Sequence, residues 1–191
     1  MSKGRLEAFS DGVIAIIITI MVLELAPPHG ATLADLRGLA PVFVSYVLSF
    51  VNVGIYWNNH HHLFQAVRVV DGRVLWANLF LLFWLSLFPF ATAWMGENGF
   101  AATTVAVYGV VLLLCAIAYY VLERTLVAEQ PSEAPLAAAV GNDVKGKVSL
   151  VLYAVAVPAS LVLPPAGLAL FATVALMWSV PDSRIERVLG R

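Results

Sequence analysis

The sequence predicts an all-α membrane protein with six transmembrane helices per chain and no soluble domain. Two observations support this fold class. Of the 191 residues, 61% are hydrophobic and 12% are charged, about half the charged share of a typical soluble domain. The charges are also clustered, and several apolar stretches between them reach the roughly 20 residues that a helix needs to cross a bilayer. We expect residues 1–191 to form one membrane domain.

Charge and cysteine content exclude two other classes. The net charge is −1, so the chain has no basic field of the kind that attracts nucleic acid, and no nucleic-acid partner is expected. Cys115 is the one cysteine and lies within an apolar run, so a disulfide framework is excluded.

Four apolar stretches are clear candidates for membrane spans. They are residues 6–25, a stretch within 38–65, residues 74–96 and residues 100–122. The second contains no Lys, Arg, Asp or Glu, and the third and fourth are also free of charge. A polar loop is expected at residues 123–147. The fourth span contains Thr104-Val-Ala-Val-Tyr-Gly109, which resembles a potassium filter loop, but it lacks the first filter glycine and is expected to be helical.

The last apolar block, residues 148–180, is too long for a single span. Pro164-Pro165-Ala166-Gly167 divides it, because proline removes a backbone donor and glycine tolerates a turn. This gives two short spans, residues 148–163 and 168–180, and Pro158 is expected to kink the first of them.

Six spans place both chain ends on the same side of the membrane, and the basic residues indicate which side. Ten of the 11 Lys and Arg residues fall on that side. They are Lys3, Arg5, Arg68, Arg73, Arg124, Lys145, Lys147, Arg184, Arg187 and Arg191. Only Arg37 falls on the other side. By the positive-inside rule, we expect a multi-pass protein of the cell (inner or plasma) membrane with both termini in the cytoplasm.

The first span begins with polar residues that an ordinary membrane helix does not need. A charge at membrane depth costs about 2.5–3.5 kcal/mol or more, yet Asp11 lies next to the apolar core of this span. We expect Asp11 to be buried against a neighbouring helix. The simpler alternative is that Ser10 or Asp11 only caps the helix N-terminus.

One face of the first span is apolar with a single hydroxyl. Residues three, four and seven apart share a helix face, and this face carries Ile16, Thr19, Ile20 and Leu23. Apolar constrictions can gate a pore by dewetting, and Thr19 could offer an oxygen to a passing cation. The alternative is an ordinary span in which the Thr19 hydroxyl bonds to its own backbone.

The residues Arg5-x-x-x-Phe9-Ser10-Asp11, followed by Gly-Val-Ile-Ala-Ile-Ile-Ile-Thr-Ile-Met-Val-Leu-Glu, resemble the signature of the transmembrane protein 175 family. This family comprises endosomal and lysosomal potassium channels and their prokaryotic relatives. The resemblance extends to Tyr56-Trp57-x-x-His60-His61 at the end of the second span. Spans three to six match only in pattern.

The resemblance implies a cation channel that passes K⁺ without the usual filter loop and assembles as a homotetramer around a central pore. It implies that Ile16 forms the first constriction and Leu23 the second, with Ile20 between them. Thr19 would correspond to a hydroxyl layer that contacts K⁺. Arg5, Phe9, Ser10 and Asp11 would tie the first helix to its neighbours. The partners implied are the lipid bilayer, monovalent cations and further copies of the chain.

The histidine cluster His60-His61-His62 ends the second span at the same membrane level as Asp11. We expect Trp57 and one of His60 or His61 to join a hydrogen-bond network with Ser10 and Asp11. Consecutive helical residues point about 100° apart, so the three histidines cannot jointly bind one metal. No metal site and no cofactor is therefore expected, and K⁺ is the permeant ion only.

Two other functions remain open from the residues alone. A proton-coupled secondary transporter could use Asp11 and a histidine of the second helix as a relay, although transporters usually show repeats or broken spans. A membrane-embedded metalloenzyme using His60 to His62 is weaker, because no further His or Cys pair lies at the same depth. We therefore expect a channel and not an enzyme.

Overall fold

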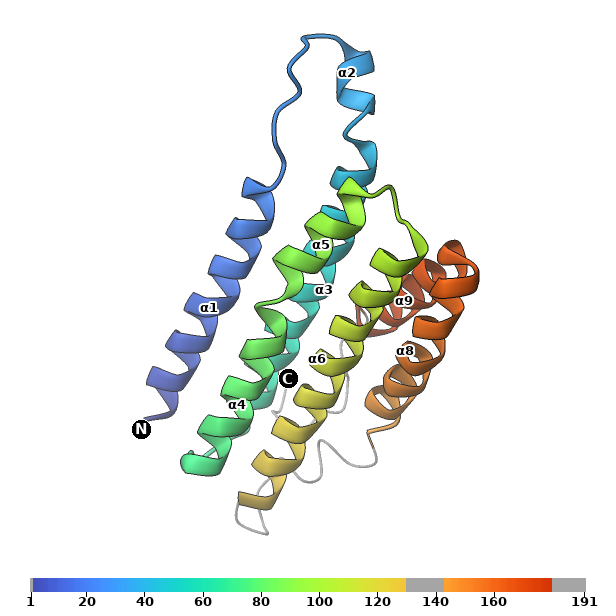
Figure 1. Cartoon of the computed structure of the whole chain (residues 1–191). Helices are drawn as coiled ribbons and strands as arrows, with labels where there is room; N and C mark the ends of the chain where they lie inside the picture. The colour runs from blue at the N-terminus through green and yellow to red at the C-terminus, as the bar shows by residue number, and fades with distance from the viewer. Residues whose placement is uncertain (1, 130–142, 180–191) are drawn as a thin grey trace.

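The computed structural model describes residues 2–129 and 143–179, and within these ranges it contains helices and no strand. The long elements are α1 (Lys3–Leu23), α3 (Ala40–Gln65), α4 (Gly72–Leu85), α5 (Phe88–Glu97), α6 (Ala102–Glu129), α8 (Val144–Val162) and α9 (Pro164–Ser179). A short helix, α2 (Leu33–Arg37), lies in the connection after α1. Figure 1 shows α1 at one edge of the bundle and α8 and α9 at the other.

The described helices are long and apolar enough for a membrane protein. Five segments have the length and hydropathy of a span, with α4 and α5 counted together as residues 72–97, and the shorter α9 is a sixth apolar helix. This confirms the predicted fold class and the sixfold division of the chain. The Pro164-Pro165 pair starts α9 directly after Leu163, which ends α8 in extended backbone.

Contacts between helix ends give the alternating direction of the segments. Lys3 Nζ donates to the backbone oxygen of Gln65 at 3.3 Å, which places the start of α1 beside the end of α3. At the other edge of the bundle, Trp178 Nε1 donates to Ser149 Oγ at 2.8 Å, so the end of α9 lies beside the start of α8. Helix α6 packs against α4, α5, α8 and α9.

The third predicted span is divided into two helices. Pro89 lies in the first turn of α5. Proline has no backbone N–H to donate to the Leu85 carbonyl, and its ring would clash with that carbonyl in a continuous helix. Helix α4 therefore ends at Leu85, and α5 begins at Phe88. The two helices follow one another along the same side of the bundle (Figure 1). Pro158 lies inside α8, and the kink expected there remains a prediction.

The predicted loop at residues 123–147 is too long at both ends. Helix α6 continues to Glu129, and α8 already begins at Val144. Two features carry α6 past its first charges: Glu123 is buried, and the Arg124 guanidinium stacks over the Tyr120 ring at 4.9 Å. Asp143 starts α8 by accepting the Gly146 N–H at 3.0 Å. The remainder of this predicted loop lies outside the described residues.

Helix α2 was not predicted from the sequence, because it is only one turn long. It is held by a reciprocal cap in which Asp35 N–H donates to the Thr32 hydroxyl and the Asp35 carboxylate accepts the Thr32 N–H. The hydrogen bond from the Thr32 hydroxyl lowers the pKa of the Asp35 carboxyl below its usual value. The carboxylate is therefore the form that this cap stabilises.

Candidate functional site

Helix α1 has one face packed against the bundle and one face that the chain leaves uncovered. The packed face consists of Leu6, Ser10, Ile14, Ile17 and Met21, all buried. Outside that face, Ile16, Ile20 and Leu23 are 58%, 40% and 79% exposed. These residues lie on the face that the sequence singles out, and residues 2–129 and 143–179 of a single copy do not bury it.

Thr19 lies on the exposed face between Ile16 and Ile20. Its hydroxyl donates to the backbone oxygen of Ile16 at 2.9 Å, which is the local bond that the sequence left open as an alternative. A hydroxyl that donates still has its oxygen lone pairs. The bond therefore fixes the direction of the Thr19 side chain and leaves an oxygen able to face a cation.

A buried hydrogen-bond chain anchors the packed face of α1. Ser10 Oγ donates to the Leu6 backbone oxygen at 2.9 Å and accepts from Asn78 Nδ2 at 2.9 Å. Asn78 Oδ1 lies 2.8 Å from His60 Nε2, which requires the proton on Nε2. The side chains of Ser10, Asn78 and His60 are all buried, and they join α1, α4 and α3 in one continuous chain.

A second, separate contact joins α1 to α3 at the surface. Trp57 Nε1 donates to Asp11 Oδ1 at 3.0 Å, and the His61 ring stacks on Trp57 with centroids 6.1 Å apart. His61 Nε2 in turn lies 2.8 Å from Gln65 Nε2. Asp11 therefore contacts α3, the second predicted span, as expected. His61 is connected to Asp11 indirectly, because its ring stacks on Trp57.

The prediction that Asp11 is buried is wrong for the single chain, because Asp11 is exposed. Adjacent helical residues point about 100° apart, so Ser10 enters the bundle while Asp11 faces outward. The sequence predicts one hydrogen-bond network, but the structure contains two. Ser10 is linked to His60 through Asn78 inside the bundle, and Asp11 bonds to Trp57 at its surface. Arg5 and Phe9 are both exposed, and within the described part of the chain the polar contact of Arg5 is a backbone hydrogen bond from its N–H to the Ser2 oxygen.

Asn78 is the member of the inner network that sequence reasoning missed. Its signal was available, because it is the only amide side chain in the predicted span 74–96. An amide inside a membrane span needs a partner, but the sequence does not say which helix provides one. Here Asn78 bridges two partners that lie 18 and 68 residues away.

A second buried polar group lies near the other end of α1 and was also missed. Thr92 Oγ1 donates to Ser49 Oγ at 2.6 Å, and Ser49 Oγ donates to the Tyr108 hydroxyl at 3.1 Å. Thr92 Oγ1 also lies 3.9 Å from Met21 Sδ. These contacts join α5, α3 and α6 behind the packed face of α1, so polar contacts support this helix near both ends.

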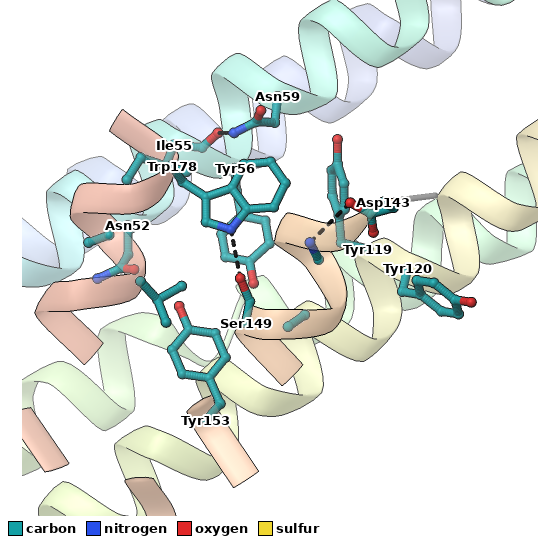
Figure 2. A pocket seen from close by; sticks show the side chains of 14 residues that line it. Asn52, Ile55, Tyr56, Asn59, Tyr119, Tyr120, Asp143, Ser149, Tyr153 and Trp178 are labelled. Carbon is teal, nitrogen blue, oxygen red and sulfur yellow. Dashed lines mark hydrogen bonds between the residues drawn. The ribbon is translucent and has the colours of Figure 1, made fainter. Parts of the chain in front are cut away.

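A small, partly open cavity lies between α3, α6, α8 and α9 (Figure 2). Its volume is about 40 Å³, enough for a few water molecules. Tyr153 points into it, and Trp178 crosses it to donate to Ser149 Oγ (Figure 2). None of its lining residues belongs to α1, so this cavity is separate from the exposed apolar face.

The histidine cluster shows no metal-binding geometry. His60, His61 and His62 have different surroundings: His60 is buried, His61 is exposed and His62 is partly exposed. Within residues 2–129 and 143–179, no group of three or more His, Cys, Asp or Glu side chains is placed to hold a metal ion.

Comparison with known proteins gives a consistent result. A family model described as "Endosomal/lysosomal potassium channel TMEM175" matches residues 5–89. A potassium channel of Chryseobacterium sp. is 50% identical over 189 residues, covering 99% of this chain and 98% of that protein. The mouse endosomal/lysosomal proton channel TMEM175 is 34% identical over 103 residues, covering 48% of this chain and 21% of the mouse protein.

A solved structure shares the whole fold. The crystal structure of a lysosomal potassium-selective channel TMEM175 homolog from Chamaesiphon minutus aligns with a TM-score of 0.80 at 27% identity. The alignment covers 94% of this chain and 97% of that one. The likeness therefore extends over the helices beyond residue 89, where the sequence alone gave only a pattern.

Proposed function

Because this chain belongs to the TMEM175 potassium-channel family, we propose that it is a potassium-permeable cation channel whose pore is lined by α1. The observation that carries the proposal is the exposed stripe of Ile16, Ile20 and Leu23 on an α1 whose other face is anchored by buried polar contacts. The relatives named as potassium channels support the choice of ion.

In this proposal the stripe acts only when it is repeated around a symmetry axis. Four copies would place four Ile16 and four Leu23 side chains in two apolar rings, separated by roughly 10 Å at 1.5 Å per residue. Ile20 would lie between them, and Thr19 would supply a ring of hydroxyl oxygens. Apolar rings can close a pore by dewetting, and oxygen atoms can replace part of the hydration shell of K⁺.

The hydrogen-bond networks on the other faces of α1 would fix the orientation of Ile16, Ile20 and Leu23 toward the pore axis. Arg5 and Phe9 are exposed in the single chain, and we propose that they contact neighbouring copies, with Asp11 and Trp57 close to the same interface. The inner chain of Ser10, Asn78 and His60 would fix the rotation of α1 within each copy. The family motif thus acts in positioning the helix, and the apolar stripe acts in permeation.

We further propose that both termini are cytoplasmic and that the protein resides in the cell membrane. Ten of the 11 basic residues lie on the side of the chain ends under this topology, as the positive-inside rule requires. The only exception, Arg37, is in α2 at the opposite end of the bundle (Figure 1).

The transporter alternative receives less support from the contacts. A relay between Asp11 and a histidine would need a direct or water-bridged hydrogen bond. Asp11 instead bonds to Trp57, and His60 bonds to Asn78. The enzyme alternative is set aside because the chain belongs to a family of channels.

Recording from the purified full-length chain in planar bilayers tests the function. We expect discrete current steps and a reversal potential that follows the K⁺ gradient. Smooth, saturable flux coupled to a second ion would identify a carrier and contradict the proposal. A reversal potential that follows the pH gradient and ignores K⁺ would instead identify a proton channel, as the mouse relative is named.

A further inference from the structure

An open groove lies between α4 and α6, near the start of α4 and the end of α6. Figure 1 shows these two helix ends at the same end of the bundle. The volume of the groove is about 640 Å³, and only residues of these two helices line it. Two of the lining residues, Arg73 and Glu129, form an ion pair with Nη1 and Oε1 3.0 Å apart. None of the residues that line the groove belongs to α1, so the proposed pore does not account for it.

The floor of the groove is apolar and uncovered. Trp76 is 75% exposed, and Phe80 and Val121 are each about 40% exposed. Trp76 lies one turn into α4, directly after its charged end. A large aromatic at this position is typical of the membrane interface, where the ring lies at headgroup level. Other apolar side chains that line the groove, Ala77, Phe80 and Val121, extend this surface along the two helices.

The mouth of the groove carries a positive charge. Arg73 is offset by Glu129, whereas Arg124 stacks on Tyr120 and forms no ion pair among the described residues. Its Nε is buried and makes no hydrogen bond. Two guanidinium groups and one carboxylate leave a net charge of +1 beside an apolar track, which is complementary to a molecule with an anionic head and an apolar tail.

We propose that this groove binds an anionic phospholipid of the cytoplasmic leaflet. The phosphate contacts Arg124 and Arg73, and one acyl chain lies along Trp76, Phe80 and Val121. A guanidinium presents paired N–H donors that match phosphate oxygens, and basic pockets between helices on the cytoplasmic side suit anionic headgroups. The assignment of the leaflet rests on the proposed topology, but binding itself does not depend on ion permeation.

Quenching of tryptophan fluorescence by brominated lipids tests this site. The full-length chain is reconstituted into phosphatidylcholine vesicles that contain brominated phosphatidylglycerol or brominated phosphatidylcholine at equal mole fraction. Subtracting the signal of Trp76→Phe isolates the contribution of Trp76. We expect brominated phosphatidylglycerol to quench Trp76 more strongly than brominated phosphatidylcholine, and 10 mM inorganic phosphate to leave the difference unchanged.

Variants that change the charge of the groove should change its preference for phosphatidylglycerol in opposite directions. Arg124→Gln should lower the preference for phosphatidylglycerol about fivefold, the usual effect of one basic residue near an anionic membrane. Glu129→Gln frees Arg73 and should raise it. Arg37→Gln removes the same charge at the opposite end of the bundle and should change nothing. Should Arg124→Gln fail to fold, Glu129→Gln tests the site alone, because its expected effect has the opposite sign.

Three results would overturn the proposal. Equal quenching by the two lipids would mean that the groove does not select charge. Quenching of Trp76 by neither lipid would mean that protein, such as a second copy of the chain, covers the groove. Loss of the difference on adding inorganic phosphate would mean that the site binds a soluble anion and not a lipid.

Discussion

Ile16 is the side chain on which the proposed constriction depends most directly. It is 58% exposed in the single chain and lies opposite the buried Ile14 on the same helix. Replacing Ile16 by Asn keeps a similar length but introduces a group that holds water. A wetted ring lowers the barrier to ion passage, and a decrease of about 1.4 kcal/mol corresponds to a tenfold rise in current. We expect Ile16→Asn to raise the basal current in bilayers by about this factor.

A matched control separates wetting of the pore from general damage. Val155 on α8 is also exposed, at 53%, but it lies on a different helix from the proposed pore face. Val155→Asn should therefore leave the current unchanged when the protein inserts to the same level. An Ile16→Asn channel with wild-type current would show that Ile16 is not the narrow point.

Asn78 is the residue whose loss should damage α1 anchoring most. Asn78→Leu keeps the number of side-chain heavy atoms, but Ser10 loses a donor and the buried His60 loses its partner. An unsatisfied buried polar group costs about 1–3 kcal/mol, so the variant should unfold at a clearly lower temperature in detergent. Asn98→Leu is the control, because the exposed Asn98 amide bonds only to its own helix. Equal thermal stability of Asn78→Leu and wild type would mean that the inner chain contributes nothing.

At the scale of the helices, close approach between α5 and α3 sets the shape of the region behind α1. A Cβ added at Gly96 would lie 2.8 Å from the backbone Cα of Val42 and would also collide with Ser45 Oγ. The serine can rotate away, but the backbone of α3 cannot move without separating the two helices. Glycine at this position therefore permits the contact that small residues provide between membrane helices.

Gly96→Ala should consequently destabilise the bundle by about 1–3 kcal/mol, the usual cost of overpacking. Thermal unfolding of the purified protein in detergent measures this. Gly72→Ala is the control, since a Cβ there meets nothing within 4 Å and Gly72 lies in the first turn of α4. If both variants unfold at the wild-type temperature, α3 and α5 are not in the contact described.

The sequence identified the apolar segments but not where each one ends. Composition and length locate a span, because a bilayer imposes both. The charges from Glu123 onward predict the end of the fourth span, yet Glu123 is buried and Arg124 packs on Tyr120, so α6 continues to Glu129. Pro89 was overlooked as a break because it lies within an otherwise uniform apolar run. Contacts of this kind depend on which side chains are neighbours in the fold, so they produce no periodic pattern in the sequence.

Of the candidate site, the sequence predicts the exposed face of α1 but not all the partners of its packed face. The face of Ile16, Ile20 and Leu23 follows from helical spacing, which is a property of one helix alone. The partners of Ser10 and Asp11 depend on the rotation of three helices against each other. Hence Trp57 was expected through a family resemblance, whereas Asn78 became apparent only from the packed structure.

At the scale of the whole molecule, the proposed pore is complete only when further copies of the chain are added. The apolar side chains on the exposed α1 face of each copy have a similar free energy in contact with lipid or with protein, because lipid tails are as apolar as leucine. In the proposed assembly, several such faces turn toward one axis, and the anchored faces turn outward into their own bundles. Phe9 and Trp57 are 52% and 45% exposed near the same edge, as expected for side chains that meet a neighbouring copy.

Subunit number is therefore the property that the proposed mechanism needs most. Native mass spectrometry of the protein released from detergent should give about four times the chain mass of 20.6 kDa. Ile16→Asn should keep this mass, because a pore-facing side chain contributes little to contacts between copies. Asp11→Ala removes the acceptor of the Trp57 bond and should shift the population toward smaller species. A wild-type protein that stays monomeric while conducting would place the ion path inside one bundle, and the exposed stripe of α1 would then have no part in permeation.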